Sequence, residues 1–319
     1  MITSTPRVIS SLLAVAIAGA LTTIHARPAA AQSATDVVCD GCVQSRDIKD
    51  RTIRSEDLAD SVLFGRTVFV PFAGNATANC DALREALAQI NDASAKNPVL
   101  VKLDRGNYQC GSTPLAMRPF VTIEGAGLSF SRIIGDVDGS DIGVITGANE
   151  AGLRRLTVEH AGTEASVAIV VNTLGRRMTL TDVAIKLDSE AVIFSLGIYA
   201  GGGILDLTNV SVRTHAPNAQ STGILGESGV RLNMMNVWVH NQSGNIGNPA
   251  ALELRDTSSV TGYGVLFSSN VFGLLGRDNS FFELFGGSVI GGRGSTGTPS
   301  FTCVGVAKED FTARAANCT

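Results

Sequence analysis

A short apolar phrase recurs through the chain at a fixed interval. It reads LRRLTV at 153–158, LTDVAI at 180–185, LTNVSV at 207–212 and MMNVWV at 234–239, so its starts are 27 residues apart three times in succession. Weaker versions start at residues 262 and 284. A period of this length that carries strand-forming residues is typical of a solenoid, in which each repeat forms one turn of a coil. We therefore expect an all-β fold, a parallel β-helix with coils of about 27 residues.

The spacing inside the phrase predicts a bend. Its apolar residues stand first, fourth and sixth; the last two alternate as in a strand, but two residues separate the first from the fourth. Asp182, Asn209 or Asn236 fills that gap, and Asp and Asn tolerate the left-handed backbone of a tight bend. We expect these three side chains to form an internal ladder of hydrogen bonds. The same stacking predicts one inner column made of Val183, Val210 and Val237.

A coil of this kind cannot bury its inner face alone, so the stack needs a cap at each end. Residues 79–91 place Leu83, Ala86, Leu87 and Ile90 at helical spacing. We expect a capping helix here, with Asn79 or Asp81 as its N-cap.

Several segments together resemble a known superfamily. VFVPFAG at 68–74, the expected cap helix, the segment at 99–127 and the coils are similar to the N-terminal layout of secreted right-handed parallel β-helix proteins of the pectin-lyase-like superfamily. The tail at 301–319 is similar to the closing segment of uncharacterised bacterial members. The resemblance covers roughly residues 67–319 and implies a right-handed coil; enzymes of the superfamily act on acidic polysaccharides with residues on the outside of the coils.

The N-terminal region is organised differently from the coils. Residues 1–31 have the Arg7, apolar run and small-residue cleavage site of an export signal, and no later segment is apolar and long enough to span a membrane. Residues 32–66 form a linker, in which 43–62 contain a near-repeat that resembles units of bacterial and phage fibres. This piece is either a solvated linker or a means of self-association between chains. The β-helix domain is expected at 67–319, in a secreted protein.

Charge and cysteines limit the partners further. Removing Arg7 and Arg27 with the signal changes the net charge of −4 to −6, so nucleic acid is not an expected partner. Six cysteines allow 15 pairings, and proximity in sequence favours Cys39 with Cys42, Cys80 with Cys110 and Cys303 with Cys318. The last two would fasten the caps. Zinc binding by Cys39 and Cys42 lacks nearby further ligands, so we expect no metal and no cofactor.

The catalytic motifs that the resemblance suggests are not assembled. No G-H-G segment or suitable R-x-K of the galacturonan hydrolases occurs, and WVHN at 238–241 lacks the aspartate of the pectate-lyase W-x-D-H. The paired aspartates and G-R-P-W type segment of pectin methylesterases are also missing. His160 is a single histidine at the end of an expected strand, where we expect a structural role.

Counting along the repeat reveals a cluster on one outer edge. The position after the last apolar residue of the phrase holds Glu159, Lys186, Arg213 and His240 in successive coils, with Trp238 and His215 two positions away. We therefore consider a candidate ligand-binding site made of Lys186, Arg213, His215, Trp238 and His240. A sugar ring could stack on the Trp while the cations hold an acidic or hydroxylated group. The alternative is a solvated face, with Glu159 paired to Lys186 and Trp238 covered by residues 241–249.

Two functions remain open at this stage. The first is an exported, non-catalytic β-helix that binds polysaccharide or cell-surface glycan, or serves as a structural module of the cell envelope. The second is a polysaccharide lyase or glycoside hydrolase with an unrecognised site, using Lys186, Arg213 or His240 as base and charge stabiliser. The missing motifs favour the first.

Overall fold

The computed structural model describes residues 64–139, 141–163, 166–172, 177–188, 194–243, 247–308 and 317–318. The expected export signal, the repeat at 43–62 and the pair Cys39–Cys42 lie outside these residues. No helix in the described part of the chain is long and apolar enough to cross a membrane.

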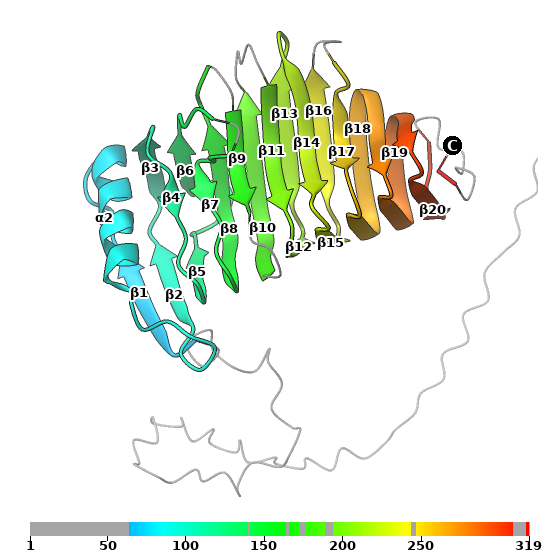
Figure 1. Ribbon diagram of the computed structural model, residues 1–319. Coiled ribbons are helices and arrows are strands. Elements are labelled where there is room, and N and C mark those ends of the chain that lie inside the picture. The colour runs from blue at the N-terminus through cyan, green and yellow to red at the C-terminus, as the bar shows by residue number, and fades with distance from the viewer. Residues whose placement is uncertain are drawn as a thin grey trace, which may run out of the picture. The chain divides into compact units, whose positions relative to one another are not determined.

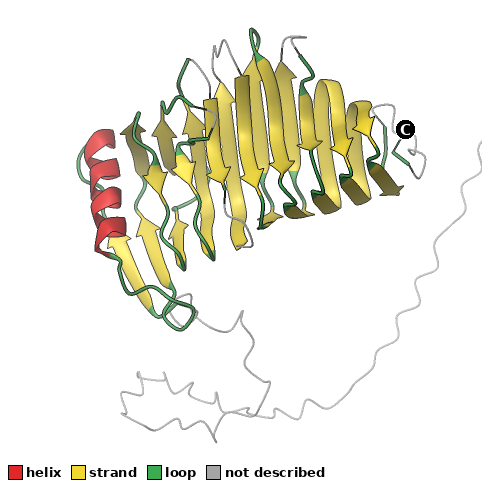
Figure 2. Cartoon of the chain, viewed as in Figure 1, coloured by secondary structure: helices red, strands yellow, loops and turns green. Residues whose placement is uncertain are grey.

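The described chain is a stack of parallel strands with a helix at its N-terminal end (Figures 1 and 2). Every pairing between named strands is parallel. The elements are β1 (Arg66–Val70), α2 (Ala76–Gln89), β2 (Val99–Leu103), β3 (Gly106–Gly111), β4 (Leu115–Ala116), β5 (Val121–Glu124), β6 (Ser131–Gly135), β7 (Ile145–Thr146), β8 (Ala151–His160), β9 (Ser166–Val171), β10 (Arg177–Asp188), β11 (Phe194–Gly201), β12 (Ile204–Thr208), β13 (Ser211–Ala216), β14 (Gln220–Glu227), β15 (Arg231–Met235), β16 (Trp238–Ser243), β17 (Ala250–Leu254), β18 (Ser259–Asp278), β19 (Phe281–Gly297) and β20 (Ser300–Val304).

Pairing divides each central coil among three faces. The first sheet contains β12 and β15, the second β13 and β16, and the third β11, β14 and β17. The long strands β10 and β18 pass through bends from one sheet to the next, because β10 pairs with β12 at its start and with β13 at its end. The chain therefore makes one full turn per repeat, as the spacing predicted.

Strand register confirms the repeat. Leu153, Leu180, Leu207 and Met234 are successive partners across the first sheet, and the weaker versions of the phrase continue the column with Gly262 and Leu284. Val183, Val210 and Val237 are all buried, with at most 1% of each side chain exposed. The expected inner column of valines is therefore correct.

Two glycines set the distance between the second and third sheets. A Cβ atom added to Gly197 would lie 2.4 Å from Val212 Cγ1, and one added to Gly223 would lie 2.2 Å from Val239 Cγ1. Both valines belong to the second sheet and both glycines to the third. The two sheets thus approach each other closely across the interior.

The bend ladder exists, but it lies at the surface. Asp182, Asn209 and Asn236 have φ of 52°, 53° and 54°, in the left-handed region. Asn209 Nδ2 donates to Asp182 Oδ1 at 2.9 Å, and Asn236 Nδ2 donates to Asn209 Oδ1 at 3.2 Å, both in exposed positions. The expectation of an internal ladder was wrong, because the outside of the bend faces water while the flanking apolar residues face the core. Arg155 and Gly264 adopt the same left-handed backbone in the coils on either side.

The capping helix begins earlier than predicted. Helix α2 starts at Ala76, and Asn75 is its N-cap, accepting a hydrogen bond from the Ala78 backbone N–H at 2.9 Å. Asn79 is instead fully buried: it accepts from Ala73 N at 2.7 Å and donates to the Asn107 carbonyl at 2.8 Å. Neither Asn79 nor Asp81 caps the helix, because both lie within it. The apolar face was predicted correctly, since Leu83, Leu87 and Ile90 are buried.

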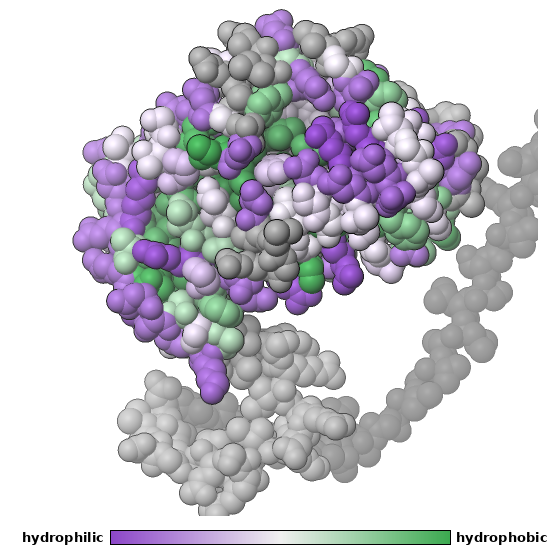
Figure 3. All heavy atoms as spheres, viewed as in Figure 1, coloured by the Kyte–Doolittle hydropathy of each residue, from purple (hydrophilic) through white to green (hydrophobic). Residues whose placement is uncertain are grey.

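Two disulfides fasten the ends of the stack. Cys80 on α2 is bonded to Cys110 on β3, and Cys303 on β20 is bonded to Cys318 in the tail. Both pairs were expected from their proximity in sequence. The surface in view mixes hydrophilic residues with smaller apolar patches, as is usual where a fold meets water (Figure 3).

Candidate functional site

The predicted edge lies on the outer surface of the second sheet. Lys186, Arg213 and His240 are direct neighbours on β10, β13 and β16, with Arg213 paired in register to both of the others. Trp238 is 42% exposed, and its ring stacks on the His240 ring with centroids 5.9 Å apart. Trp238 is therefore open to solvent and not buried. His215 lies one row further along, in register with Asp188 and Gln242.

The cations of this edge lack ion-pair partners within the described residues. Glu159 pairs with Arg132 and not with Lys186, although Glu159 and Lys186 are register partners. Partial burial and then the charge of Arg213 lower the pKa of His240, which favours a neutral ring at neutral pH. The edge is thus a row of basic side chains beside an aromatic surface. We call Lys186, Arg213, His215, Trp238 and His240 the basic edge.

His160 is buried and is held by hydrogen bonds on both sides of its ring. Its Nε2 lies 2.7 Å from the Val137 carbonyl oxygen, and its Nδ1 accepts from Gly162 N at 2.9 Å. Only the neutral tautomer with a proton on Nε2 satisfies both contacts. Burial lowers the pKa of this histidine, against the opposing hydrogen bond with Val137 and the charges of Asp138 and Asp136. The side chain therefore supports the fold.

A cleft on the outer surface of the third sheet is a second candidate site. It measures about 290 Å³, near the lower end of the size range of small-ligand pockets, roughly 300–1,000 Å³. Apolar and aromatic side chains form part of its wall and polar groups the rest. The lining residues are Asp141, Phe194, Leu196, Tyr199, Gln220, Thr222, Leu225, Glu227 and Arg255. We call this the third-sheet cleft.

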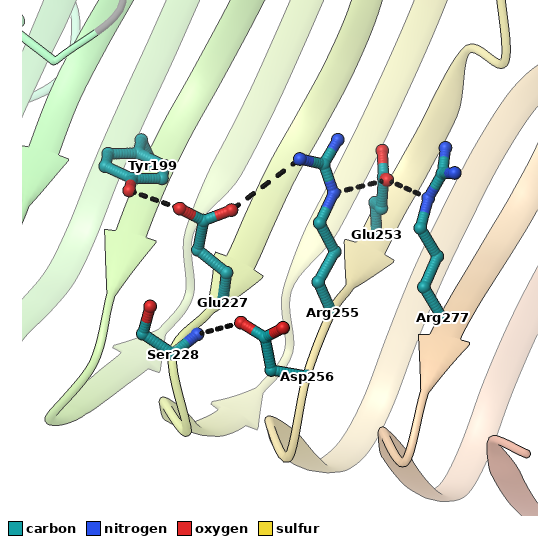
Figure 4. A network of polar contacts seen from close by, with 7 residues as sticks. All are labelled: Tyr199, Glu227, Ser228, Glu253, Arg255, Asp256 and Arg277. Atoms are coloured by element: carbon teal, nitrogen blue, oxygen red, sulfur yellow. Dashed lines mark hydrogen bonds and ion pairs between the residues drawn. The ribbon is translucent and has the colours of Figure 1, made fainter. Parts of the chain in front are cut away.

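A chain of polar contacts runs along one side of the cleft (Figure 4). The Tyr199 hydroxyl donates to Glu227 Oε1 at 2.5 Å, and Arg255 Nη1 lies 3.6 Å from Glu227 Oε2. Arg255 Nε and Arg277 Nε both donate to Glu253 Oε1, at 2.8 Å and 2.6 Å. These contacts cross four successive coils and hold the side chains of the cleft wall in place.

The same network sets the protonation of the cleft. Burial raises the pKa of the Tyr199 hydroxyl, and so do the hydrogen bond to Glu227 and its charge, so this group remains a donor. Burial acts to lower the pKa of Arg255, but its bonding to Glu253 and the nearby carboxylates outweigh this, so it stays charged. Glu253 is fully buried, and its Oε2 has no hydrogen-bond partner in the part of the chain that the structure describes.

The turn beneath the network is fixed by a hydrogen bond from the backbone of one coil to a side chain of the next. Ser228 follows β14 with a left-handed φ of 57°, and its N–H donates to Asp256 Oδ2 at 2.9 Å (Figure 4). Asp256 belongs to the next coil and has the same left-handed backbone. The cleft residues are thus positioned by the stacked strands β11, β14 and β17 and by the stacked turns at Ser228 and Asp256 that follow β14 and β17.

Sequence reasoning overlooked these residues, although a signal was present. Charged residues interrupt apolar runs in LELRD at 252–256 and LLGRD at 274–278, two segments 22 residues apart. That interval is the register spacing between β17 and β18, where Glu253 pairs with Leu275, and it brings Arg255 and Arg277 to corresponding positions. Charge inside a buried strand pattern could have pointed to this network.

Among the described residues, no group of three or more His, Cys, Asp or Glu side chains is placed to hold a metal ion. The cleft can instead offer hydrogen-bond donors, acceptors and an apolar surface to an organic ligand.

Comparisons with known proteins add little to this geometry. No protein-family model matches the chain. No curated protein sequence matches it. Among solved structures, it is similar to the A-module of the mannuronan C-5 epimerase AlgE4 of Azotobacter vinelandii, with 12% identity over 78% of this chain and 92% of the module, at a TM-score of 0.26. A superposition this loose carries no argument about activity, so the function rests on the site itself.

Proposed function

We propose that this protein binds a neutral, hydroxyl-rich saccharide in the third-sheet cleft. The observation that carries the proposal is the Tyr199–Glu227–Arg255 network, which holds donors and acceptors in the wall of a concave site. The lining of this site also includes the apolar side chains of Phe194, Leu196 and Leu225. Saccharides present hydroxyl groups at their edges and C–H groups on their faces. A pocket with fixed polar groups beside apolar and aromatic surface suits both.

The charges of the cleft favour a neutral ligand. Among the described lining residues, Asp141 and Glu227 are acidic and Arg255 is the only basic one, and Glu227 and Glu253 already engage it. An anionic sugar would meet an excess of negative charge. A neutral sugar can donate its hydroxyl hydrogens to the carboxylates and accept from the guanidinium.

We further propose where the protein acts and to which superfamily it belongs. It is an exported, right-handed parallel β-helix of the pectin-lyase-like superfamily, acting at or outside the cell envelope as a binding or structural module. The sequence at 1–31, the two disulfides and the parallel coils support this reading. Disulfides of this kind persist in oxidising compartments.

The test is binding of neutral mono- and disaccharides, including glucose, galactose, mannose and their α-1,4 and β-1,4 dimers, measured by saturation-transfer NMR and calorimetry. Glu227→Gln removes the charged acceptor and should weaken binding about tenfold. Glu283→Gln is the matched control, since Glu283 lies on β19 and outside the cleft. Equal affinities for the two variants, or no binding across the panel at millimolar concentrations, would contradict the proposal.

A second candidate is a polysaccharide lyase or glycoside hydrolase. The observation that favours it is the Tyr199 hydroxyl bonded to Glu227, because such a pair can transfer a proton when a substrate displaces the contact. An assay for unsaturated or reducing ends on acidic and neutral polysaccharides tests it. Turnover that disappears in both Tyr199→Phe and Glu227→Gln would establish an enzyme in place of a binding protein.

A further inference from the structure

The outer surface of the first sheet carries a line of apolar side chains on its C-terminal strands. Met235 on β15, Tyr263 on β18, Phe285 on β19 and Val304 on β20 are successive partners in the strand register. Met235, Tyr263 and Val304 are 50%, 53% and 54% exposed, and the rings of Tyr263 and Phe285 stack with centroids 4.9 Å apart. We call these four residues the apolar row. On a soluble protein, a contiguous exposed apolar patch marks an interaction site.

The fold does not require apolar residues at this position of the coil. The two preceding strands of the same sheet place Thr181 and Thr208 there, in register with Met235. The position faces outward in each of these coils, so its side chain does not help to fill the interior. The change from threonine to large apolar residues is therefore confined to the C-terminal end of the sheet, where a partner can cover it.

The apolar row is complementary to itself. A two-fold axis that runs along the strands, between β18 and β19, would place Tyr263 of each copy opposite Phe285 of the other. The same axis would place Met235 of each copy opposite Val304 of the other. The strands of the two copies then run in the same direction and their stack axes in opposite directions, so the sheets can pack face to face about 10 Å apart. Every member of the row thus meets an apolar side chain.

Two charged residues beside the row fit the same arrangement. Arg231 on β15 and Glu283 on β19 lie on the outer surface, an even number of residues before Met235 and Phe285. Neither has an ion-pair partner among the residues that the structure describes. Across the two-fold axis, Arg231 of one copy is offset from Glu283 of the other by one coil and two residues, which an extended arginine side chain can span.

We propose that the apolar row, with Arg231 and Glu283, binds a second copy of this chain in this two-fold arrangement. The inference does not depend on the proposed function, because the cleft residues lie on the third sheet. The face spans only β15, β18, β19 and β20, a small contact beside the roughly 800 Å² per partner of a stable interface. The dimer is therefore weak and reversible.

The experiment is sedimentation velocity of the full chain from low micromolar to millimolar concentration. We expect a shift from monomer to dimer as the concentration rises. Tyr263→Lys places a charge at the centre of the contact and should weaken the dimer at least about tenfold. Met235→Lys covers the case in which Tyr263→Lys fails to fold. Lys186→Glu is the matched control, because it changes an exposed charge on the second sheet and should leave the dimer unchanged.

Exchange of the two charges tests the geometry. Arg231→Glu and Glu283→Arg should each weaken the dimer, because each variant places like charges opposite one another. A mixture of these two variants should associate again, since each copy supplies the charge that the other lacks. Far-UV circular dichroism checks that every variant folds.

The proposal is overturned if the chain stays monomeric at every concentration, or if Tyr263→Lys and Met235→Lys associate as Lys186→Glu does. The second result would assign the association to another part of the chain, such as residues 43–62. Failure of the folded Arg231→Glu and Glu283→Arg variants to associate in a mixture would overturn it as well. A monomeric chain that binds a neutral glucan or anionic lipid vesicles, and loses that binding in Tyr263→Lys, would assign the row to that ligand instead.

Discussion

The Asn209 side-chain amide donates to the carboxylate of Asp182 on the preceding coil at 2.9 Å, while both residues hold a left-handed backbone. Each coil bends at the same position of the repeat, so the bend residue of one coil lies beside the bend residue of the next and can bond to it. Since the pair is exposed, its hydrogen bond competes with water and contributes less than a buried one.

Asn209→Leu should lower the free energy of unfolding by about 1–2 kcal/mol, because leucine accepts a left-handed backbone poorly and leaves two neighbours without their contact. Asn209→Gly keeps the backbone preference and removes only the side-chain bonds, so it should cost less. Denaturant titration of both variants measures the difference. If the two lose equal stability, backbone conformation is not what selects Asn at the bend.

His160 predicts a pH dependence of stability. Its pKa in the folded protein is lowered from 6.5, so the unfolded chain binds this proton more readily than the folded one. The contribution of the neutral ring is therefore complete above pH 6.5 and is lost as the pH falls below that value. Denaturant titrations on both sides of that pH should show a loss of stability in acid that is smaller in His160→Gln. An identical pH profile for the variant would assign the loss to other groups.

The disulfide Cys303–Cys318 closes a segment of 15 residues and should stabilise the domain by about 3 kcal/mol through the unfolded state. We expect Cys303→Ser/Cys318→Ser to lose roughly that amount, and the denatured, unreduced protein to titrate no free thiol. Cys39→Ser/Cys42→Ser is the comparison, since the pairing of those two cysteines stays a prediction. Two or more reactive thiols in the parent chain would show that one of the three expected pairs does not form.

Gly223 should tolerate no side chain. A Cβ at this position would lie 2.2 Å from Val239 Cγ1 and 2.6 Å from the Ala251 carbonyl oxygen, so Gly223→Ala should cost about 2–3 kcal/mol through forced separation of two sheets. Gly286→Ala is a control for backbone strain alone, because Gly286 has φ +67° and open space around it, and about 1 kcal/mol is expected there. Thermal melts compare the two. Similar losses would mean that the interior can widen freely.

Much of the fold was predictable because the contacts of a solenoid recur at one fixed sequence separation. A residue packs against those one repeat away. The 27-residue interval between Leu180 and Leu207 therefore gives the period and also predicts that these two residues are neighbours. Even the weaker phrases at 262 and 284 were in the correct register. The helix start was missed because Asn75, Asn79 and Asp81 are all acceptable cap residues, and only the position of the chain against β3 buries Asn79.

The basic edge was visible in the sequence for the same reason: Lys186, Arg213 and His240 share one position of a regular repeat. The third-sheet cleft was not, because its residues lie outside the recurring phrase. Tyr199, Glu227 and Arg255 are 28 residues apart, one more than the repeat, and segments of different length separate the third sheet from the phrase in each coil.

The sequence by itself thus determined the period, the strand register, the bend positions and the pairs Cys80–Cys110 and Cys303–Cys318. These follow from side-chain alternation, backbone preference and short chain separation. Only the tertiary structure showed that the ladder of Asp182, Asn209 and Asn236 faces water and that Glu159 pairs with Arg132. It also showed that Tyr199, Glu227 and Arg255 line one cleft. Side-chain direction at irregular positions depends on how neighbouring coils stack in three dimensions, and no interval along the chain encodes it.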